Sequence, residues 1–149
     1  APEATKEVFT EDGWFRTGDR GLFNKKNLLE IKGRIKNMIV GASGENIYPE
    51  EIESVINKMK FVMESLVKEE KGKLIAMIHL NMEEMEENFK HLKLEAQQFF
   101  SEKSEEILVE IHKKVNTELN KFSRIQQVIL QPIPFERTPT KKIKRFLYA

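Results

Sequence analysis

The chain has 149 residues, about the length of one domain, with 25 Lys and Arg against 24 Asp and Glu and a net charge of +1. This balance excludes the broad basic field with which proteins hold nucleic acids, so any phosphate chemistry has to be local. The absence of cysteine excludes disulfides and thiolate metal sites, and it favours a reducing compartment.

No apolar run approaches the roughly 20 residues that a membrane-spanning helix requires. We therefore predict a cytoplasmic protein without a transmembrane segment, with peripheral attachment to a membrane as the alternative location. The chain starts at Ala1, without an initiator methionine and already in a polar, turn-rich segment. We expect it to be a piece of a longer protein.

Short strands, turns and one helix are predicted for the N-terminal part. Six of the seven glycines lie within residues 11–44, and glycine adopts the positive φ angles that tight turns require. A helix is predicted from Pro49, because proline suits a first helical position and two glutamates stand in the first turn. One buried face of this helix is indicated by the helical spacing of Ile52, Val55, Ile56 and Met59.

The rest of the chain alternates strand and helix patterns. Residues 61–80 predict a β-hairpin, because β-prone runs flank a turn at Lys71 and Gly72. Residues 82–100 predict a helix whose core stripe comprises Met82, Met85, Phe89, Leu92, Ala96 and Phe99. A second helix is predicted from about Ser104, an N-cap residue type, to Leu119. Residues 128–130 predict a strand, and the proline-rich residues 132–140 leave regular structure.

These elements together predict an α+β fold with a short β-hairpin, a central three-stranded sheet and flanking helices. The three histidines, His79, His91 and His112, fall on separate elements without ligand spacing, so we predict no metal site and interpret them as surface or boundary residues. Two carboxylate pairs stand at a helix start and a turn, where they need no catalytic explanation: Glu50 with Glu51, and Glu69 with Glu70.

Three stretches carry the candidate chemistry. GWFRTGD (residues 13–19) places a carboxylate on a glycine turn, where it could accept hydrogen bonds from two adjacent hydroxyls, as on a ribose, or be an ordinary turn. GRIKNMIVGASGENIYPEEIE (residues 33–53) leads through a glycine loop to the predicted helix. RTPTKKIKR (residues 137–145) sets five cations around a stiff proline turn, and a lysine ammonium suits phosphate as a point charge.

In order and spacing, these three stretches resemble the C-terminal portion of the adenylate-forming superfamily of acyl-CoA synthetases, luciferases and peptide-synthetase adenylation domains. The resemblance spans essentially the whole chain. It implies that residues 1–35 are the end of the N-terminal adenylation domain plus a linker, and that residues 36–149 are a small, mobile C-terminal lid domain. The implied substrates are a carboxylic acid, ATP and coenzyme A, with Mg²⁺ held mainly by the N-terminal domain.

The resemblance also implies a role for each matching residue. Asp19 is expected to bind the adenylate ribose with help from Arg34, and Lys36 is the hinge about which the lid turns. Lys142 is the catalytic lysine, which reaches the α-phosphate and carboxylate oxygens during adenylation. The channel for the coenzyme A thiol is expected to be lined by Gly41, Ser43, Gly44 and Glu45.

Lys141 departs from the commonest family pattern, which has glycine immediately before the catalytic lysine. A residue other than glycine in the left-handed conformation costs only about 1 kcal/mol. The TPTxKxKR form, GENIYPEEIE and the added helical length at residues 82–103 look like the long-chain fatty acyl-CoA synthetase branch. The resemblance therefore implies a long-chain fatty acid–CoA ligase, an acid–thiol ligase, of which this piece alone lacks the phosphate loop and is expected to be inactive.

Two other functions stay open at this point. A polyanion-binding module would use Arg137, Lys141, Lys142, Lys144 and Arg145, but the balanced charge and the scarcity of nearby stacking aromatics oppose nucleic acid as a partner. A stand-alone adaptor would keep the lid fold and lack the chemistry.

Overall fold

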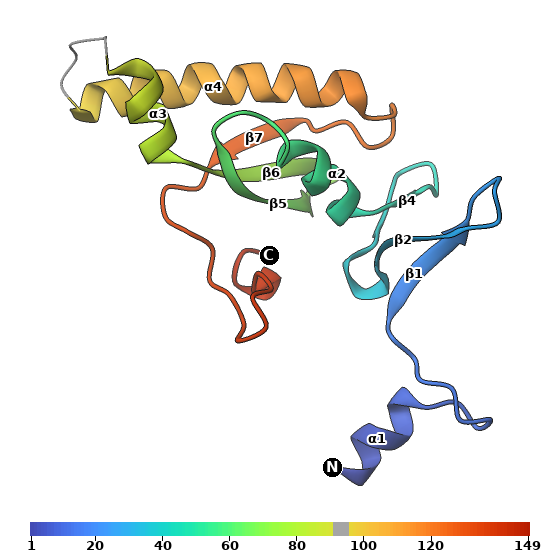
Figure 1. Cartoon of the computed structure of the whole chain (residues 1–149). Helices are drawn as coiled ribbons and strands as arrows, with labels where there is room; N and C mark the ends of the chain where they lie inside the picture. Colours follow the sequence, from blue (N-terminus) through green and yellow to red (C-terminus); the bar gives the residue numbers. More distant parts are fainter. Residues whose placement is uncertain (91–95) are drawn as a thin grey trace.

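The computed structural model describes residues 1–90 and 96–149, which Figure 1 shows in chain order. A 3-10 turn, Ile35–Asn37, connects the first strand pair to the second. Short strands separated by turns confirm the prediction for residues 11–44. The elements of this part are α1 (Pro2–Val8), the antiparallel pair β1 (Asp19–Phe23) and β2 (Leu29–Arg34), and the antiparallel pair β3 (Ile39–Val40) and β4 (Asn46–Ile47).

A mixed three-stranded sheet forms the centre of the fold, in the order β5 (Val62–Glu70), β6 (Lys73–Leu80) and β7 (Gln127–Leu130). β5 and β6 make the predicted antiparallel hairpin, turning through Lys71 and Gly72 at φ angles of 51° and 77°. β6 and β7 are parallel, and parallel neighbours need a long crossover. Helices α3 (Met82–Phe89) and α4 (Ala96–Glu118) lie in that crossover, so the predicted α+β fold is confirmed.

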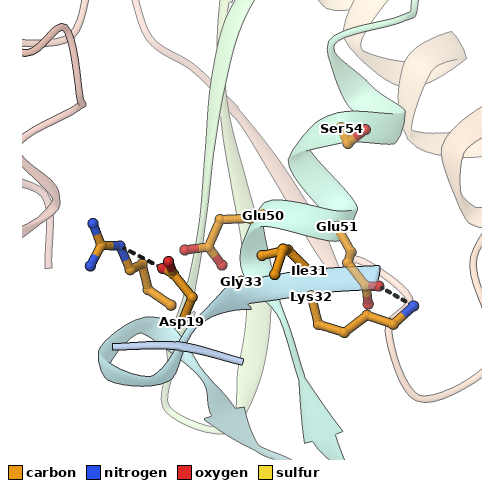
Figure 2. Close-up of a pocket in the computed structure, with 8 residues that line it drawn as sticks. Asp19, Ile31, Lys32, Gly33, Glu50, Glu51 and Ser54 are labelled. Atoms are coloured by element: carbon orange, nitrogen blue, oxygen red, sulfur yellow. Dashed lines mark ion pairs between the residues drawn. The ribbon is translucent and has the colours of Figure 1, made fainter. Parts of the chain in front are cut away.

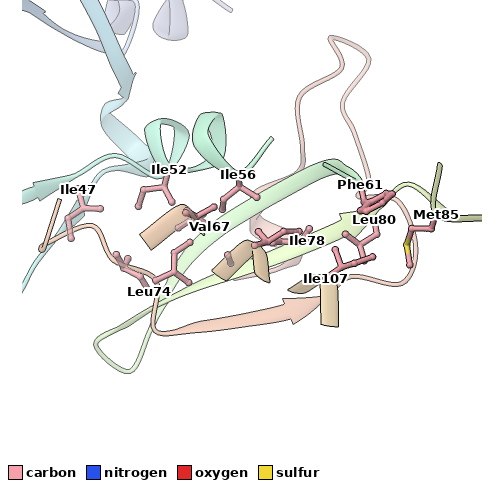
Figure 3. Close-up of a cluster of buried hydrophobic side chains, with 14 residues drawn as sticks. Ile47, Ile52, Ile56, Phe61, Val67, Leu74, Ile78, Leu80, Met85 and Ile107 are labelled. Atoms are coloured by element: carbon pink, nitrogen blue, oxygen red, sulfur yellow. The ribbon is translucent and has the colours of Figure 1, made fainter. Parts of the chain in front are cut away.

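The hydrophobic core lies between this sheet and the helices α2 (Pro49–Ile56) and α4, as Figure 3 shows. Successive side chains of a strand point to opposite faces, so alternate residues of β6 enter the core: Leu74, Ala76, Ile78 and Leu80. The helices add Ile52, Ile56, Ile107, Ile111 and Val115. In Figure 1 α4 runs along one side of the sheet, and the chain after β7 continues on the other.

Helix α2 begins as the sequence predicts, with Tyr48 at the N-cap, Pro49 first and two glutamates in the first turn. It ends at Ile56, so the half-buried Met59 packs against the core from beyond the helix. Among the helices that the structure describes, none is both long and apolar enough to cross a membrane.

The predicted division of the helical region at Ser104 is wrong. α4 begins at Ala96, and Ser104 is buried within it. The capping preference of serine was the only signal for a start there, and the apolar pattern on both sides overrides it. His91 and Leu92 lie outside the described residues, as does the side chain of Ala96.

Two burial predictions are also wrong. Met82 is 39% exposed, because it is the first residue of α3 next to the N-cap Asn81, whose side chain accepts the Glu84 N–H at 3.2 Å. His79 is buried instead of lying at the surface, and its Nδ1 lies 2.8 Å from the carbonyl oxygen of Gln131.

Val115→Ala should lower the free energy of unfolding by about 2–3 kcal/mol, because it removes two buried methyl groups and leaves a cavity. Val115 is 0% exposed, whereas Val109 on the same helix is 69% exposed. Val109→Ala is therefore the matched control, since it makes the same change in helix propensity and should alter stability by no more than about 0.5 kcal/mol. Urea unfolding of both variants measures the difference, and equal effects would contradict the assigned core.

Candidate functional site

Asp19 and Arg34, the predicted ribose-binding pair, lie opposite each other on β1 and β2. Arg34 Nε lies 3.1 Å from Asp19 Oδ1, and Arg34 Nη1 donates to the carbonyl oxygen of Thr17 at 3.0 Å. Gly18, at a φ of 75°, allows the chain to turn between Thr17 and Asp19. Hairpin register thus brings together two residues that are distant in sequence, and Arg34 orients the carboxylate.

A pocket of about 520 Å³ lies between this hairpin and α2, and Figure 2 shows its lining side chains. Asp19 stands on the hairpin side, and Glu50 and Glu51 on the α2 side. Arg34 lines the pocket from β2. Lys32 bridges the two walls, because its ammonium lies 3.1 Å from a carboxylate oxygen of Glu51. Most of the residues that line the pocket are charged or polar, and the Asp19 carboxylate is within reach of solvent.

Lys36, the predicted hinge, lies in the 3-10 turn that joins β2 to β3, and its side chain is exposed. This single turn is the connection between the β1–β2 hairpin and the following elements. Lys36 therefore lies between the β1–β2 hairpin and the rest of the domain. Rotation of the domain about Lys36 stays a prediction.

The loop at residues 41–45 is a tight turn closed by two backbone hydrogen bonds. Gly41 N–H donates to the Glu45 carbonyl at 2.8 Å, and Gly44 N–H donates to the Gly41 carbonyl at 3.0 Å. The Glu45 side chain folds back over Gly41 so closely that a Cβ there would lie 1.9 Å from Glu45 Oε1. A side chain at position 41 would therefore displace the Glu45 side chain from this place, while Ser43 and Gly44 remain exposed. Their contact with coenzyme A stays a prediction.

Lys142, the predicted catalytic lysine, closes a turn in the segment after β7. Thr138 N–H donates to the Lys142 carbonyl and Lys141 N–H to the Thr138 carbonyl, both at 2.8 Å. Lys141 has a φ of 62°, so it adopts the left-handed conformation that glycine takes most easily. The structure shows that lysine is accommodated there. The Lys142 side chain is exposed, and Figure 1 places this C-terminal segment (red) apart from the β1–β2 hairpin (blue).

Most of the cations in residues 137–145 are neutralised within the domain. Arg137 pairs with Glu64 on β5, and Arg145 pairs with Glu53 on α2 at 2.6 Å. Lys144 lies 3.5 Å from Glu136. In the part of the chain that the structure describes, no ion pair engages Lys141 or Lys142. The basic run therefore presents two unneutralised cations instead of five.

Glu53 and Glu64 are the site residues that sequence reasoning missed. Both carboxylates are buried, and their partners lie 92 and 73 positions away in the chain. Glu53 follows the buried Ile52 in α2 and Glu64 precedes the buried Ser65 in β5, and no local pattern marks either glutamate as buried. Burial raises the pKa of the Glu53 carboxyl, and the Arg145 guanidinium and the Val67 N–H offset that effect only in part.

Metal ligation has no support within residues 1–90 and 96–149, where no three His, Asp or Glu side chains come together as a metal site. His112 instead contacts the Ile125 carbonyl oxygen through Nε2 at 2.7 Å. The candidate site is therefore made of a carboxylate and arginine pair, a glycine loop and a lysine turn.

Several known proteins are similar in sequence to parts of this chain. No protein-family model matches the chain. It is 56% identical over 55 residues to the long-chain-fatty-acid–CoA ligase FadD13 of Mycobacterium tuberculosis, and 38% identical over 77 residues to the long-chain-fatty-acid–CoA ligase ACSBG2 of Rattus norvegicus. It is 46% identical over 57 residues to the nonribosomal peptide synthetase atrA of Aspergillus terreus. These matches cover 37%, 51% and 38% of this chain but only 10%, 12% and 6% of the relatives.

Solved structures match nearly the whole chain. A Mycobacterium tuberculosis fatty acyl CoA synthetase is 34% identical with a TM-score of 0.56, and ATP-bound MatB from Rhodopseudomonas palustris is 26% identical with a TM-score of 0.66. Each match covers 99% of this chain and 26% of the solved chain. The chain belongs to the adenylate-forming superfamily. It corresponds to the C-terminal domain of these enzymes and is homologous to acid–thiol ligases, and it spans about a tenth of the curated ligases it matches.

The substitution Glu53→Gln tests whether the buried Glu53 carboxyl makes the stability of this adenylate-forming domain depend on pH. The folded state raises the pKa of Glu53 above its ordinary value of 4.5, so the folded protein holds the proton more tightly than the unfolded chain. The stability of the wild type relative to Glu53→Gln should therefore fall as the pH rises from about 4 to 7.

Urea unfolding across this pH range measures the effect. Glu110→Gln is the control, because Lys114 lowers the pKa of the exposed Glu110 carboxyl below 4.5, so its stability difference from the wild type should stay nearly constant above that pH. A stability difference for Glu53→Gln that stays constant or grows with pH would contradict the assignment.

Proposed function

We propose that the chain is the C-terminal lid of an ATP-dependent long-chain fatty acid–CoA ligase. In this proposal residues 1–35 are the end of the N-terminal domain with its linker, and residues 36–149 are the lid. The reaction converts fatty acid, ATP and coenzyme A to acyl-CoA, AMP and pyrophosphate through an acyl-adenylate. Similarity to the long-chain-fatty-acid–CoA ligases FadD13 and ACSBG2 supports a long-chain fatty acid as the carboxylic acid substrate.

The observation that supports the proposal most directly is that Lys142 is exposed and has no ion-pair partner among the described residues. It is an exposed cation on a turn closed by backbone hydrogen bonds, in a run whose arginines are committed to buried glutamates. During adenylation a carboxylate oxygen attacks the α-phosphorus of ATP and pyrophosphate leaves, so negative charge shifts at that centre. A preplaced ammonium stabilises this charge more than it stabilises the separated reactants.

The remaining residues take supporting roles. The ion pair with Arg34 engages Asp19 Oδ1, and the carboxylate faces the pocket, where it would accept hydrogen bonds from the ribose hydroxyls. Lys36 would be the pivot between the adenylation and thioester-forming orientations of the lid. The turn at residues 41–45 would line the path of the coenzyme A thiol, which attacks the acyl carbonyl and expels AMP. The proposal assigns Mg²⁺ mainly to the N-terminal domain.

The polyanion-binding alternative loses its main argument, because Arg137, Lys144 and Arg145 are paired with carboxylates of the same domain. Two unneutralised cations give little of the counterion release on which polyanion binding depends. The adaptor alternative predicts that the full-length protein releases no pyrophosphate from ATP. An assay of pyrophosphate release with fatty acid and ATP therefore separates the adaptor from the ligase.

Lys142→Ala in the full-length protein should reduce the rate of pyrophosphate release with fatty acid and ATP by about 10²–10³-fold, the usual effect of losing a transition-state donor. Lys141→Gly is the control, because glycine adopts the φ of 62° found at this position and leaves Lys142 in place. A Lys142→Ala variant that forms acyl-adenylate at the wild-type rate would refute the assigned role.

A further inference from the structure

The side chain of Arg137 contacts the turn that carries Lys142. Arg137 Nη1 donates to the carbonyl oxygen of Lys141 at 2.6 Å. That carbonyl belongs to the peptide bond between Lys141 and Lys142, so holding it fixes the direction in which the chain enters Lys142. Arg137 also forms an isolated antiparallel bridge with Ile143, which places it across the turn from the lysine.

The other edge of the Arg137 guanidinium is held by Glu64. Arg137 Nε donates to Glu64 Oε2 at 3.1 Å, and Nη2 donates to the same oxygen. The second oxygen, Glu64 Oε1, accepts the Phe135 N–H at 2.7 Å. The Glu64 side chain is only 10% exposed, whereas that of Arg137 is 42% exposed. A rigid carboxylate on the central sheet therefore anchors both the start of the loop and the guanidinium that reaches its tip.

We infer that Arg137, oriented by Glu64, is a positioning residue that holds Lys142 for adenylation. The inference rests on the proposed function, because it assigns to Arg137 the placement of the cation proposed there. Glu64 also neutralises Arg137, so the guanidinium can lie close to the loop without adding a further free charge to those of Lys141 and Lys142. The arrangement aligns one ammonium through the backbone and not through a direct side-chain contact.

The pair Arg145 and Glu53 provides a matched comparison within the same segment. It also joins an arginine to a buried glutamate, at 2.6 Å, but Arg145 donates its other bond to the Val67 carbonyl on the sheet. This pair attaches the segment after Lys142 to the domain without contacting the turn at Lys141. Arg145 therefore attaches the C-terminal segment to the domain, and Arg137 positions the turn at Lys141.

Arg137→Lys in the full-length protein tests the inference. Lysine keeps the charge but presents a single ammonium, which lacks the planar fork that joins Glu64 to the Lys141 carbonyl. Adenylation, followed as pyrophosphate release, should fall by roughly 10- to 100-fold, since misplacement of a reacting group by about 1 Å has effects of that size. Thioester formation from supplied acyl-adenylate and coenzyme A should stay near the wild-type rate.

A double-mutant cycle distinguishes positioning from a structural role. If Arg137 acts through Lys142, Arg137→Lys should have no further effect on adenylation in a Lys142→Ala background. Equal effects in both backgrounds, or an equal loss in both half-reactions, would overturn the inference. If Lys142→Ala alone leaves adenylation intact, the proposed function itself fails, and that result is distinct from a harmless Arg137→Lys in a protein that needs Lys142.

Two further variants complete the experiment. Glu64→Gln keeps an oxygen for the Phe135 N–H and removes the charge that orients Arg137, so it should reproduce the selective loss of adenylation and serves if Arg137→Lys does not fold. Arg145→Lys should affect the two half-reactions alike. A selective loss in Arg145→Lys as large as that in Arg137→Lys would overturn the assignment to the Lys141 carbonyl.

Discussion

Two buried carboxylates hold the C-terminal segment to the rest of the domain. Glu53 on α2 pairs with Arg145, and Glu64 on β5 pairs with Arg137. Removing a carboxylate from water costs several kcal/mol unless charge and hydrogen bonds compensate for it. Each glutamate therefore depends on an arginine from the far end of the sequence, and the path of that end depends on the glutamates. The two buried glutamates and the turn that carries Lys142 therefore stabilise each other through these ion pairs.

This dependence explains how an exposed turn can be well defined. The turn at residues 138–142 contributes little to the core described above, and its own backbone hydrogen bonds span only a few residues. Such short turns are marginal when isolated, because little apolar surface compensates for the entropy of ordering the chain. Anchors on both sides, through Glu64 before the turn and Glu53 after it, restrict the turn to one place.

Local features of the fold could be predicted from the sequence, and the long-range pairs could not. Residue period and turn chemistry were sufficient for the hairpin around Gly72, the start of α2 at Pro49 and the strand β7. Of the site, the sequence placed Asp19 and Arg34 by motif, and the structure shows them paired. It missed Glu53 and Glu64 because nothing local distinguishes a glutamate that will be buried against an arginine from one that stays in water. The false helix start at Ser104 has the related cause that a capping residue type is also tolerated within a helix.

The same pairs decide how the charge of residues 137–145 should be understood. Summed along the sequence, the run has five cations, which resembles a polyanion-binding surface. Three of them are neutralised by glutamates of the domain, and sequence-independent nucleic-acid binding depends on the number of phosphates that free lysines and arginines neutralise. What remains is a small charge held at a defined place, and catalysis at a single phosphorus depends on the position of a charge more than on its total. Among the described residues, internal pairing thus leaves Lys141 and Lys142 as the two cations of the run that no carboxylate neutralises.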